Sequence, residues 1–266
     1  MIKVEDYHKL YKETVAVSGL SFEVPPGAIL GMVGPNGAGK TTTLRAIAGI
    51  IEPTRGQLSV CDYKADSIDA KRRLAYIPDE PRLFESLTVW EHLQFAAAAY
   101  QVDQFESKAE HLLGQFELLE KRDTIAQELS RGMRQKVAIC SAYLFDPTAI
   151  LFDEPHTGLD PHGIRTMKDT VLKRAEQGAS VIVSSHLLSM IEDTCTHLLI
   201  LIKGKAGFYG TMDEVRQAYP ELGDGSSLED IFFHATSDGE SESASETDEA
   251  AASSASPVGP TDPPEN

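Results

Sequence analysis

The first 34 residues carry the hydrophobic pattern of β-strands. Residues 16–24, AVSGLSFEV, alternate apolar and polar side chains, as a half-buried strand does. Residues 28–34, AILGMVG, form a continuous apolar run that ends in glycine. A helix is predicted to begin near Gly39 and to run through residues 41–50. Further strands are predicted at 57–60 and 73–78.

The later part of the chain alternates helical and strand patterns. Helical spacing runs from Thr88 to about Leu119, and Ser130, a favoured N-cap residue, precedes a helix that is predicted to reach Phe145. The remaining predicted elements are strands at 150–153 and 180–185, a helix at 161–177, a pair of strands within 197–210, and helices at 211–219 and 227–235. Strands that alternate with helices indicate parallel βαβ units. We therefore predict an α/β core with a helical insertion at about 85–145.

The composition is that of an ordinary globular protein, with 41% hydrophobic residues in 266. The longest apolar run, residues 197–202, is much shorter than the roughly 18 residues that a membrane span needs. The N-terminus is charged throughout, so no secretory signal is expected. The three cysteines are odd in number and lack metal-ligand spacing, which favours a reducing, cytosolic environment.

The formal net charge of −17 is unevenly distributed along the chain. Residues 236–266 hold eight acids and no Lys or Arg, which leaves −9 on residues 1–235. That acidic body disfavours a general nucleic-acid surface, so no nucleic-acid partner is expected. The last stretch consists mainly of Ser, Ala, Glu and Pro, and it is predicted to be a disordered, solvated tail. The domain prediction is therefore a folded unit at 1–235 followed by a tail at 236–266.

Residues 34–42, GPNGAGKTT, carry the strongest chemical signal. They fit the pattern G-x-x-x-x-G-K-[ST] between a predicted strand and a predicted helix. In such a loop, backbone N–H groups and the helix N-terminus bind phosphate. Lys40 is predicted to contact the β- and γ-phosphates of a nucleotide, and the Thr41 hydroxyl to bind Mg²⁺. The phosphate-binding residues are thus predicted to be Gly34, Pro35, Asn36, Gly37, Ala38, Gly39, Lys40, Thr41 and Thr42.

Two adjacent carboxylates, Asp153 and Glu154, stand where the apolar residues 150–152 end. Charge beside a core strand is costly unless it is paired or binds a metal. Because a phosphate loop is present, we expect Asp153 to bind Mg²⁺, directly or through water. Glu154 is expected to orient or deprotonate the attacking water. The alternative, in which both acids merely cap the next helix, is the weaker interpretation beside such a loop.

The phosphate loop and the two acids alone would fit a kinase, a GTPase or a motor. Residues 129–136, LSRGMRQK, distinguish among these classes. Their position between the phosphate loop and the acidic strand resembles the signature segment of ABC transporter ATPases, and the resemblance covers about residues 3–235. The other matching positions are Tyr11 for the adenine-stacking aromatic, 34–42 for Walker A, Asp153 and Glu154 for Walker B, 157–160 for the D-loop and His186 for the switch histidine. The resemblance implies an α/β P-loop NTPase core with an N-terminal antiparallel β subdomain and a helical insertion.

The resemblance also implies how ATP is bound. In this family two subunits pair head to tail, so that Ser130 and Gly132 of one chain would face the γ-phosphate held by the other. Asp160 would help the two sites communicate, and His186 would hydrogen-bond the γ-phosphate and help hold the attacking water. The implied cofactors are ATP and Mg²⁺. The implied partners are a second ATPase subunit, in a homodimer or heterodimer, and a separately encoded integral membrane permease. Through that permease the chain is expected to lie in the cytoplasm, on the inner face of the cell membrane.

Two positions depart from the family pattern. Arg131 replaces the first glycine of the usual Ser-Gly-Gly, which is tolerable if its side chain points outward. Asp79 replaces a glutamine that contacts Mg²⁺ and water. At about 4 Å and an effective dielectric of about 20, attraction to Mg²⁺ and repulsion from phosphate are each worth about 4 kcal/mol, so the net sign stays open. An acid at this point resembles the ATPases of ABC-2 type exporters, and Asp79 is predicted to be a working metal-site residue.

The apolar residues Pro81, Leu83, Phe84 and Leu87 are candidates for docking a permease, although ordinary burial explains them equally well. We predict that His156 and His162 are loop residues without a role in the site.

The alternative function is a soluble ABC ATPase that acts in translation or DNA maintenance. It is disfavoured because the chain has one module and only 90 residues separate Lys40 from Ser130. A small-molecule kinase does not explain residues 129–136 or His186.

Overall fold

The computed structural model describes residues 1–222 and 226–236. The predicted disordered tail lies outside the described residues, apart from Thr236. In chain order the elements are β1 (Ile2–Tyr11), β2 (Thr14–Val24), β3 (Ile29–Val33), α1 (Lys40–Ile47), β4 (Arg55–Val60), β5 (Tyr63–Lys64), α2 (Ile68–Lys71), β6 (Leu74–Ile77), α3 (Val89–Tyr100), α4 (Glu106–Gln115), η1 (Leu119–Lys121), η2 (Ala126–Glu128), α5 (Arg131–Tyr143), β7 (Ala149–Asp153), α6 (Pro161–Glu176), β8 (Ser180–Ser184), α7 (Leu188–Thr194), β9 (His197–Ile202), β10 (Lys205–Thr211), α8 (Met212–Ala218) and η3 (Pro220–Leu222). Residues 228–236 are also helical.

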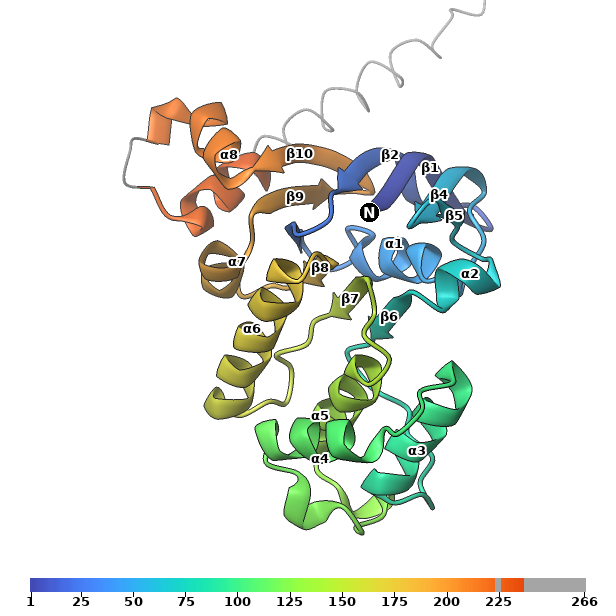
Figure 1. The fold of residues 1–266 in the computed structure, drawn as a ribbon. Helices are drawn as coiled ribbons and strands as arrows, with labels where there is room; N and C mark the ends of the chain where they lie inside the picture. Colours follow the sequence, from blue (N-terminus) through green and yellow to red (C-terminus); the bar gives the residue numbers. More distant parts are fainter. Residues whose placement is uncertain (223–225, 237–266) are drawn as a thin grey trace, which may run out of the picture.

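Two sheets organise these elements. A six-stranded sheet has the order β10-β9-β3-β8-β7-β6, in which every pairing is parallel except that of β10 with β9. A four-stranded antiparallel sheet has the order β2-β1-β4-β5. In Figure 1 the antiparallel sheet lies at the top of the molecule, and α3, α4 and α5 gather at the bottom. The predicted α/β class, with an antiparallel sheet and a helical insertion, is confirmed.

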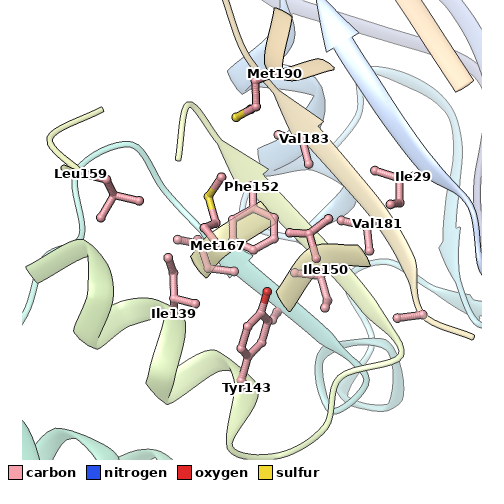
Figure 2. Close-up of a cluster of buried hydrophobic side chains, with 14 of the residues drawn as sticks. Ile29, Ile139, Tyr143, Ile150, Phe152, Leu159, Met167, Val181, Val183 and Met190 are labelled. Carbon is pink, nitrogen blue, oxygen red and sulfur yellow. The ribbon is translucent and has the colours of Figure 1, made fainter. Parts of the chain in front are cut away.

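The continuous apolar run of β3 is explained by burial on both faces of the six-stranded sheet. Ile29 and Val33 contribute to one hydrophobic cluster with the helical part, whereas Leu30 and Met32 contribute to a second cluster with α1 and the antiparallel sheet. β7 divides its side chains in the same way, and Phe152 packs on the helical side (Figure 2). Strands buried on both faces carry few polar residues, so polar groups gather where the strands end.

Two predicted helices have different bounds in the structure. The helical pattern at 88–119 had two segments, 87–100 and 106–119, and they form α3 and α4; Gln101, in a left-handed conformation (φ 57°), ends α3, and α4 ends at Gln115 rather than near Leu119. Thr88 begins α3 as an N-cap, since its side chain accepts a hydrogen bond from Glu91 N. The helix that follows Gly39 ends at Ile47 instead of continuing to residue 50. The short helix α7 was not predicted.

Candidate functional site

The phosphate loop joins β3 to α1, as its sequence predicted. Gly39 precedes α1 with φ 104°, and a Cβ there would lie 2.8 Å from the carbonyl oxygen of Ala16, so only glycine fits without strain. The first hydrogen bond of the helix runs from Thr43 N to Gly39 O, at 2.9 Å. The amides of residues 40–42 therefore have no acceptor within the helix, and they can bind an anion. Of the other loop residues, Pro35, Asn36 and Gly37 are exposed and Ala38 is buried.

Lys40 folds back onto the loop that it follows. Its Nζ donates to the carbonyl oxygen of Gly34 at 2.6 Å and to that of Pro35 at 3.3 Å. The same Nζ lies 3.9 Å from Glu154 Oε1, and the lysine side chain is only 8% exposed. The Lys40 ammonium therefore lies beside the loop. A charged phosphate oxygen bound to the loop can replace the two neutral carbonyl oxygens as its hydrogen-bond acceptor.

Asp153 ends β7 and is only 2% exposed. Its Oδ1 accepts hydrogen bonds from Thr41 Oγ1 at 3.0 Å and Ser184 Oγ at 2.9 Å, and its Oδ2 accepts one from Tyr76 Oη at 3.2 Å. Thr41 and Asp153 thus present hard oxygen donors side by side, the chemistry that Mg²⁺ requires. Their side chains fit a Mg²⁺ site.

Tyr76 and Ser184 belong to this site, although the sequence analysis did not identify them. Ser184 pairs with Asp153 in the register of β7 and β8, and Tyr76 lies on the next strand, β6. Burial, with the Asp153 charge as a further cause, raises the pKa of Tyr76 to about 12. Tyr76 therefore stays protonated and donates to the carboxylate at neutral pH.

Glu154 has an unusual backbone conformation that turns its side chain away from the path of β7. Its φ is 50°, in the left-handed region that a residue other than glycine occupies at a cost of roughly 1–3 kcal/mol. The neighbouring strand holds it there, because Glu154 N donates to both the carbonyl and the hydroxyl oxygen of Ser184, each at 3.1 Å. Such strain is typical of functional positions.

The carboxylate of Glu154 lies against His186. Glu154 Oε2 accepts hydrogen bonds from His186 Nδ1 at 2.8 Å and from His186 N at 3.2 Å. The His186 side chain is 65% exposed, whereas that of Glu154 is 18% exposed. The two predicted catalytic residues are therefore in contact, and the histidine reaches toward solvent.

His156 lies in the loop after β7, as predicted, but the structure places it in this cluster, which the sequence analysis did not anticipate. It is buried, and its Nε2 lies 3.4 Å from His186 Nε2 and 3.8 Å from Glu154 Oε2. Burial lowers the pKa of His156, while the Glu154 charge opposes that effect. His162 is exposed, and its Nδ1 lies 3.4 Å from Glu117 Oε2.

The signature segment begins α5. Ser130 caps the helix, since its Oγ accepts a hydrogen bond from Met133 N at 3.3 Å. A Cβ on Gly132 would lie 2.1 Å from the carbonyl oxygen of Gly158, so this segment touches the predicted D-loop closely. Any side chain at Gly132 would force the first turn of α5 and the predicted D-loop apart.

Asp160 and Tyr11 are the remaining predicted site residues. Asp160 caps α6 by accepting a hydrogen bond from Gly163 N at 3.0 Å, and this bond, with Lys136 Nζ at 3.3 Å, lowers the pKa of its carboxyl. Tyr11 ends β1 with 45% of its surface exposed, and Lys9 Nζ lies 5.0 Å from the ring centroid. Its exposure permits the predicted stacking on adenine.

The two departures from the family pattern form one ion pair. Arg131 Nη2 lies 2.9 Å from Asp79 Oδ1 and 3.7 Å from Glu80 Oε1. The Arg131 side chain is 47% exposed, which meets the condition under which the sequence analysis considered it tolerable. The ion pair between Asp79 and Arg131 therefore links the segment after β6 to the signature segment.

Replacing Asp79 with alanine or glutamine is expected to slow Mg²⁺-dependent ATP hydrolysis several-fold, because each change frees Arg131 from its 2.9 Å partner. Both partners are about half exposed, so the free energy of unfolding should fall by no more than about 1 kcal/mol. Phosphate release and thermal denaturation measure the two effects, and Glu85→Gln, at an exposed acid of the same segment, is the control. Wild-type rates in both Asp79 variants would leave this residue without a role in turnover.

Comparisons with known proteins agree with this geometry. The family model described as "ABC transporter" matches residues 17–157. The ABC-type transporter ATP-binding protein EcsA of Bacillus subtilis is 32% identical over 240 residues, which cover 89% of this chain and 96% of EcsA. The SkfA peptide export ATP-binding protein SkfE of the same organism is 33% identical and covers 77% of this chain and 87% of SkfE. A solved structure of an ATP-binding subunit of an ABC transporter is 34% identical, with a TM-score of 0.84 over 88% of this chain and 99% of that one.

Proposed function

Because this chain belongs to the ABC transporter family, as an ATP-binding subunit that hydrolyses ATP, we propose that it energises an exporter of the ABC-2 type through a separate permease. The observation that carries the hydrolytic part of this proposal is the contact of Glu154 with His186 beside the phosphate loop and the buried Asp153. A nucleotide on that loop would meet a carboxylate, an imidazole and an ammonium at once.

The phosphates of ATP are proposed to bind residues 34–42. The amides at the start of α1 and Lys40 Nζ would contact the β- and γ-phosphates, and the exposed ring of Tyr11 would stack on adenine. Thr41 and Asp153 would hold Mg²⁺. Asp79, which is paired with Arg131, would contribute to the metal site only after leaving that ion pair. The ion would neutralise charge on the phosphate oxygens.

Hydrolysis is proposed to follow from the two groups that already touch. Glu154 would accept a proton from the attacking water or orient it toward the γ-phosphorus, in line with the leaving group. His186 would hold the carboxylate in place and donate a hydrogen bond to the γ-phosphate, because its exposed ring reaches beyond Glu154. Lys40 would stabilise the charge that develops as the bond breaks.

A second subunit is proposed to complete each site. Ser130 is exposed, and the first amides of α5 point out of its capped N-terminus, which is an anion-binding geometry. Ser130 and Gly132 of one subunit would contact the γ-phosphate bound to residues 34–42 of the other, with Asp160 near the junction of the two sites. The free energy that ATP binding can supply for moving attached membrane domains is limited. It cannot exceed the difference between the binding free energies of ATP for the open and closed dimers.

Export is supported by the name of one relative, a peptide export ATP-binding protein. Attached to its permease, the subunit would act at the inner face of the cell membrane. Among the helices of the described residues, none combines the length and apolarity that a bilayer span requires. Asp79 in the segment YIPDEP and the ending SLEDIFFHAT support the ABC-2 subtype by resemblance.

The permease is proposed to dock on the segment after β6. Phe84 is 56% exposed and contacts Phe95, itself 55% exposed, with ring centroids 5.4 Å apart. A cavity of about 560 Å³ beside this pair is lined by Pro81 and Leu83, among others. The lining also includes charged side chains, among them Arg82, Glu85 and Arg134. An exposed aromatic pair beside a hollow of mixed apolar and charged lining suits an amphipathic helix of a membrane partner.

Replacing Phe84 with serine is expected to reduce recovery of the permease at least several-fold, with little change in ATPase activity of the isolated subunit, because Phe84 contacts solvent rather than the core. Pull-down from native membranes, with identification of the bound multispanning protein, measures the loss. Ile68→Ser removes another exposed apolar side chain, 70% exposed, and serves as the control. Absence of any membrane protein from the wild-type pull-down would contradict the proposed function.

A further inference from the structure

Glu154, His156 and His186 form a compact group of metal-ligating side chains. Within residues 1–222 and 226–236, they are the one group of three or more such residues whose donor atoms all lie within 4.8 Å of one another. Two of the three have proposed roles in hydrolysis. His156 has none, although it is buried and points at both of the others.

The spacing of the donor atoms suits a small tetrahedral cation. Bonds of about 2.0–2.1 Å in tetrahedral geometry place ligand atoms roughly 3.3–3.4 Å apart. His156 Nε2 lies 3.4 Å from His186 Nε2 and 3.8 Å from Glu154 Oε2. The third distance joins His186 Nε2 to Glu154 Oε2. The ring of His186 can move to adjust it, because its side chain is 65% exposed.

Hydrogen bonds around the cluster orient the imidazole nitrogens. The ionised carboxylate of Glu154 can only accept, so His186 Nδ1 carries the proton of their 2.8 Å bond. In the neutral ring, His186 Nε2 then has a free lone pair, and it lies 3.4 Å from His156 Nε2. Because the same ring donates Nδ1–H to Glu154 Oε2, the exposed His186 side chain gives up that bond and rotates when Nε2 and Oε2 bind one cation. His156 Nδ1 lies 3.3 Å from Ser185 Oγ, a contact of the kind that fixes ligand histidines from behind.

The Lys40 ammonium lies near one oxygen of the Glu154 carboxylate and the two histidines lie near the other, so a cation can bind on the histidine side. Lys40 Nζ lies 3.9 Å from Oε1 of Glu154, whereas the histidines face Oε2. Lys40 also donates to the carbonyl oxygens of Gly34 and Pro35, which fix its position on the loop side. The carboxylate therefore separates the ammonium from the nitrogen pair.

We propose that Glu154, His156 and His186 bind a borderline divalent cation, represented by Zn²⁺, in the nucleotide-free subunit. One carboxylate and two imidazoles are a ligand set that Zn²⁺ accepts, and three protein ligands leave a fourth position for water. The oxygen pair of Thr41 and Asp153 suits Mg²⁺ instead. Zn²⁺ bound to Glu154 Oε2 and His186 blocks ATP hydrolysis, a consequence that rests on the proposed function.

Direct binding to the full, nucleotide-free chain tests the site without reference to activity. Titration with Co²⁺ is expected to give the visible absorption of a four-coordinate ion, and Zn²⁺ is expected to displace it with one ion bound. His156→Asn retains a group near Ser185 but lacks Nε2, so the affinity should fall by more than the ~10–100-fold typical of losing a mere outer-shell partner. His162→Asn, at an exposed histidine, should bind as the wild type does.

A second variant guards against misfolding of the buried site. His186→Asn changes an exposed side chain and should also weaken Co²⁺ binding, with an unchanged circular dichroism spectrum. Equal affinity in the wild type, His156→Asn and His186→Asn would overturn the site. Zn²⁺ should inhibit the wild-type ATPase, and this inhibition should be lost in His156→Asn relative to that variant's metal-free rate. Zn²⁺ binding without inhibition would overturn only the proposed effect on ATP hydrolysis. A fully active Glu154→Gln variant would refute the proposed function, but it would not contradict metal binding by the wild-type chain.

Discussion

Replacing Glu154 with glutamine is expected to lower the rate of ATP hydrolysis by roughly 10²- to 10⁴-fold, the usual contribution of a general base. The amide has the size of the carboxylate, and its oxygen can still accept the hydrogen bond that His186 Nδ1 donates at 2.8 Å. The backbone hydrogen bonds that hold residue 154 in its left-handed conformation do not involve the side chain. The variant should therefore fold, bind ATP and fail in the chemical step.

Single-turnover hydrolysis and equilibrium ATP binding separate these effects. ATP affinity should stay at or above the wild-type value, and the variant should accumulate as a nucleotide-bound dimer in size-exclusion chromatography. Glu120→Gln, at an exposed acid in the helical part, is the matched control and should hydrolyse ATP normally. A wild-type rate in Glu154→Gln would show that another group activates the water.

Replacing Lys40 with alanine is expected to weaken ATP binding by about 10- to 100-fold, since a hydrogen bond to a charged group contributes about 1.5–3 kcal/mol. Lys40 Nζ already lies within 3.3 Å of two loop carbonyl oxygens, so it needs only a small movement to reach a phosphate. Calorimetric titration with ATP measures the change. Lys9→Ala, near the proposed adenine site, should have a much smaller effect, because Lys9 Nζ donates to the carbonyl oxygen of Glu52 instead. Unchanged affinity in Lys40→Ala would place the triphosphate elsewhere.

Local sequence signals predicted the parts of the site that lie within one turn or one strand end. Residues 34–42 join a strand to a helix, and Ser130 caps α5, because both depend on short-range backbone chemistry. Asp153 and Glu154 were identified for the same reason, since charge after a buried strand needs a partner.

Contacts between distant segments could not be predicted in this way. Arg131 and Asp79 are 52 residues apart, and their ion pair depends on how the helical part packs against β6. His156 is buried because Ser185 and His186, which follow β8, lie over it. No local pattern distinguishes such a histidine from the exposed His162. The polar side chains of Tyr76 and Ser184 became site residues only through the strand order of the parallel sheet.

The central claim is that residues 34–42 of one subunit hold the triphosphate, and that Ser130 and Gly132 of another subunit complete its binding site. A crystal structure of the Glu154→Gln chain with Mg²⁺ and ATP tests it most directly. We predict a head-to-tail dimer in which Ser130 and the amides at the start of α5 contact the γ-phosphate on the opposite subunit. A nucleotide-bound monomer, or a dimer joined through a face that leaves Ser130 away from the nucleotide, would contradict the account.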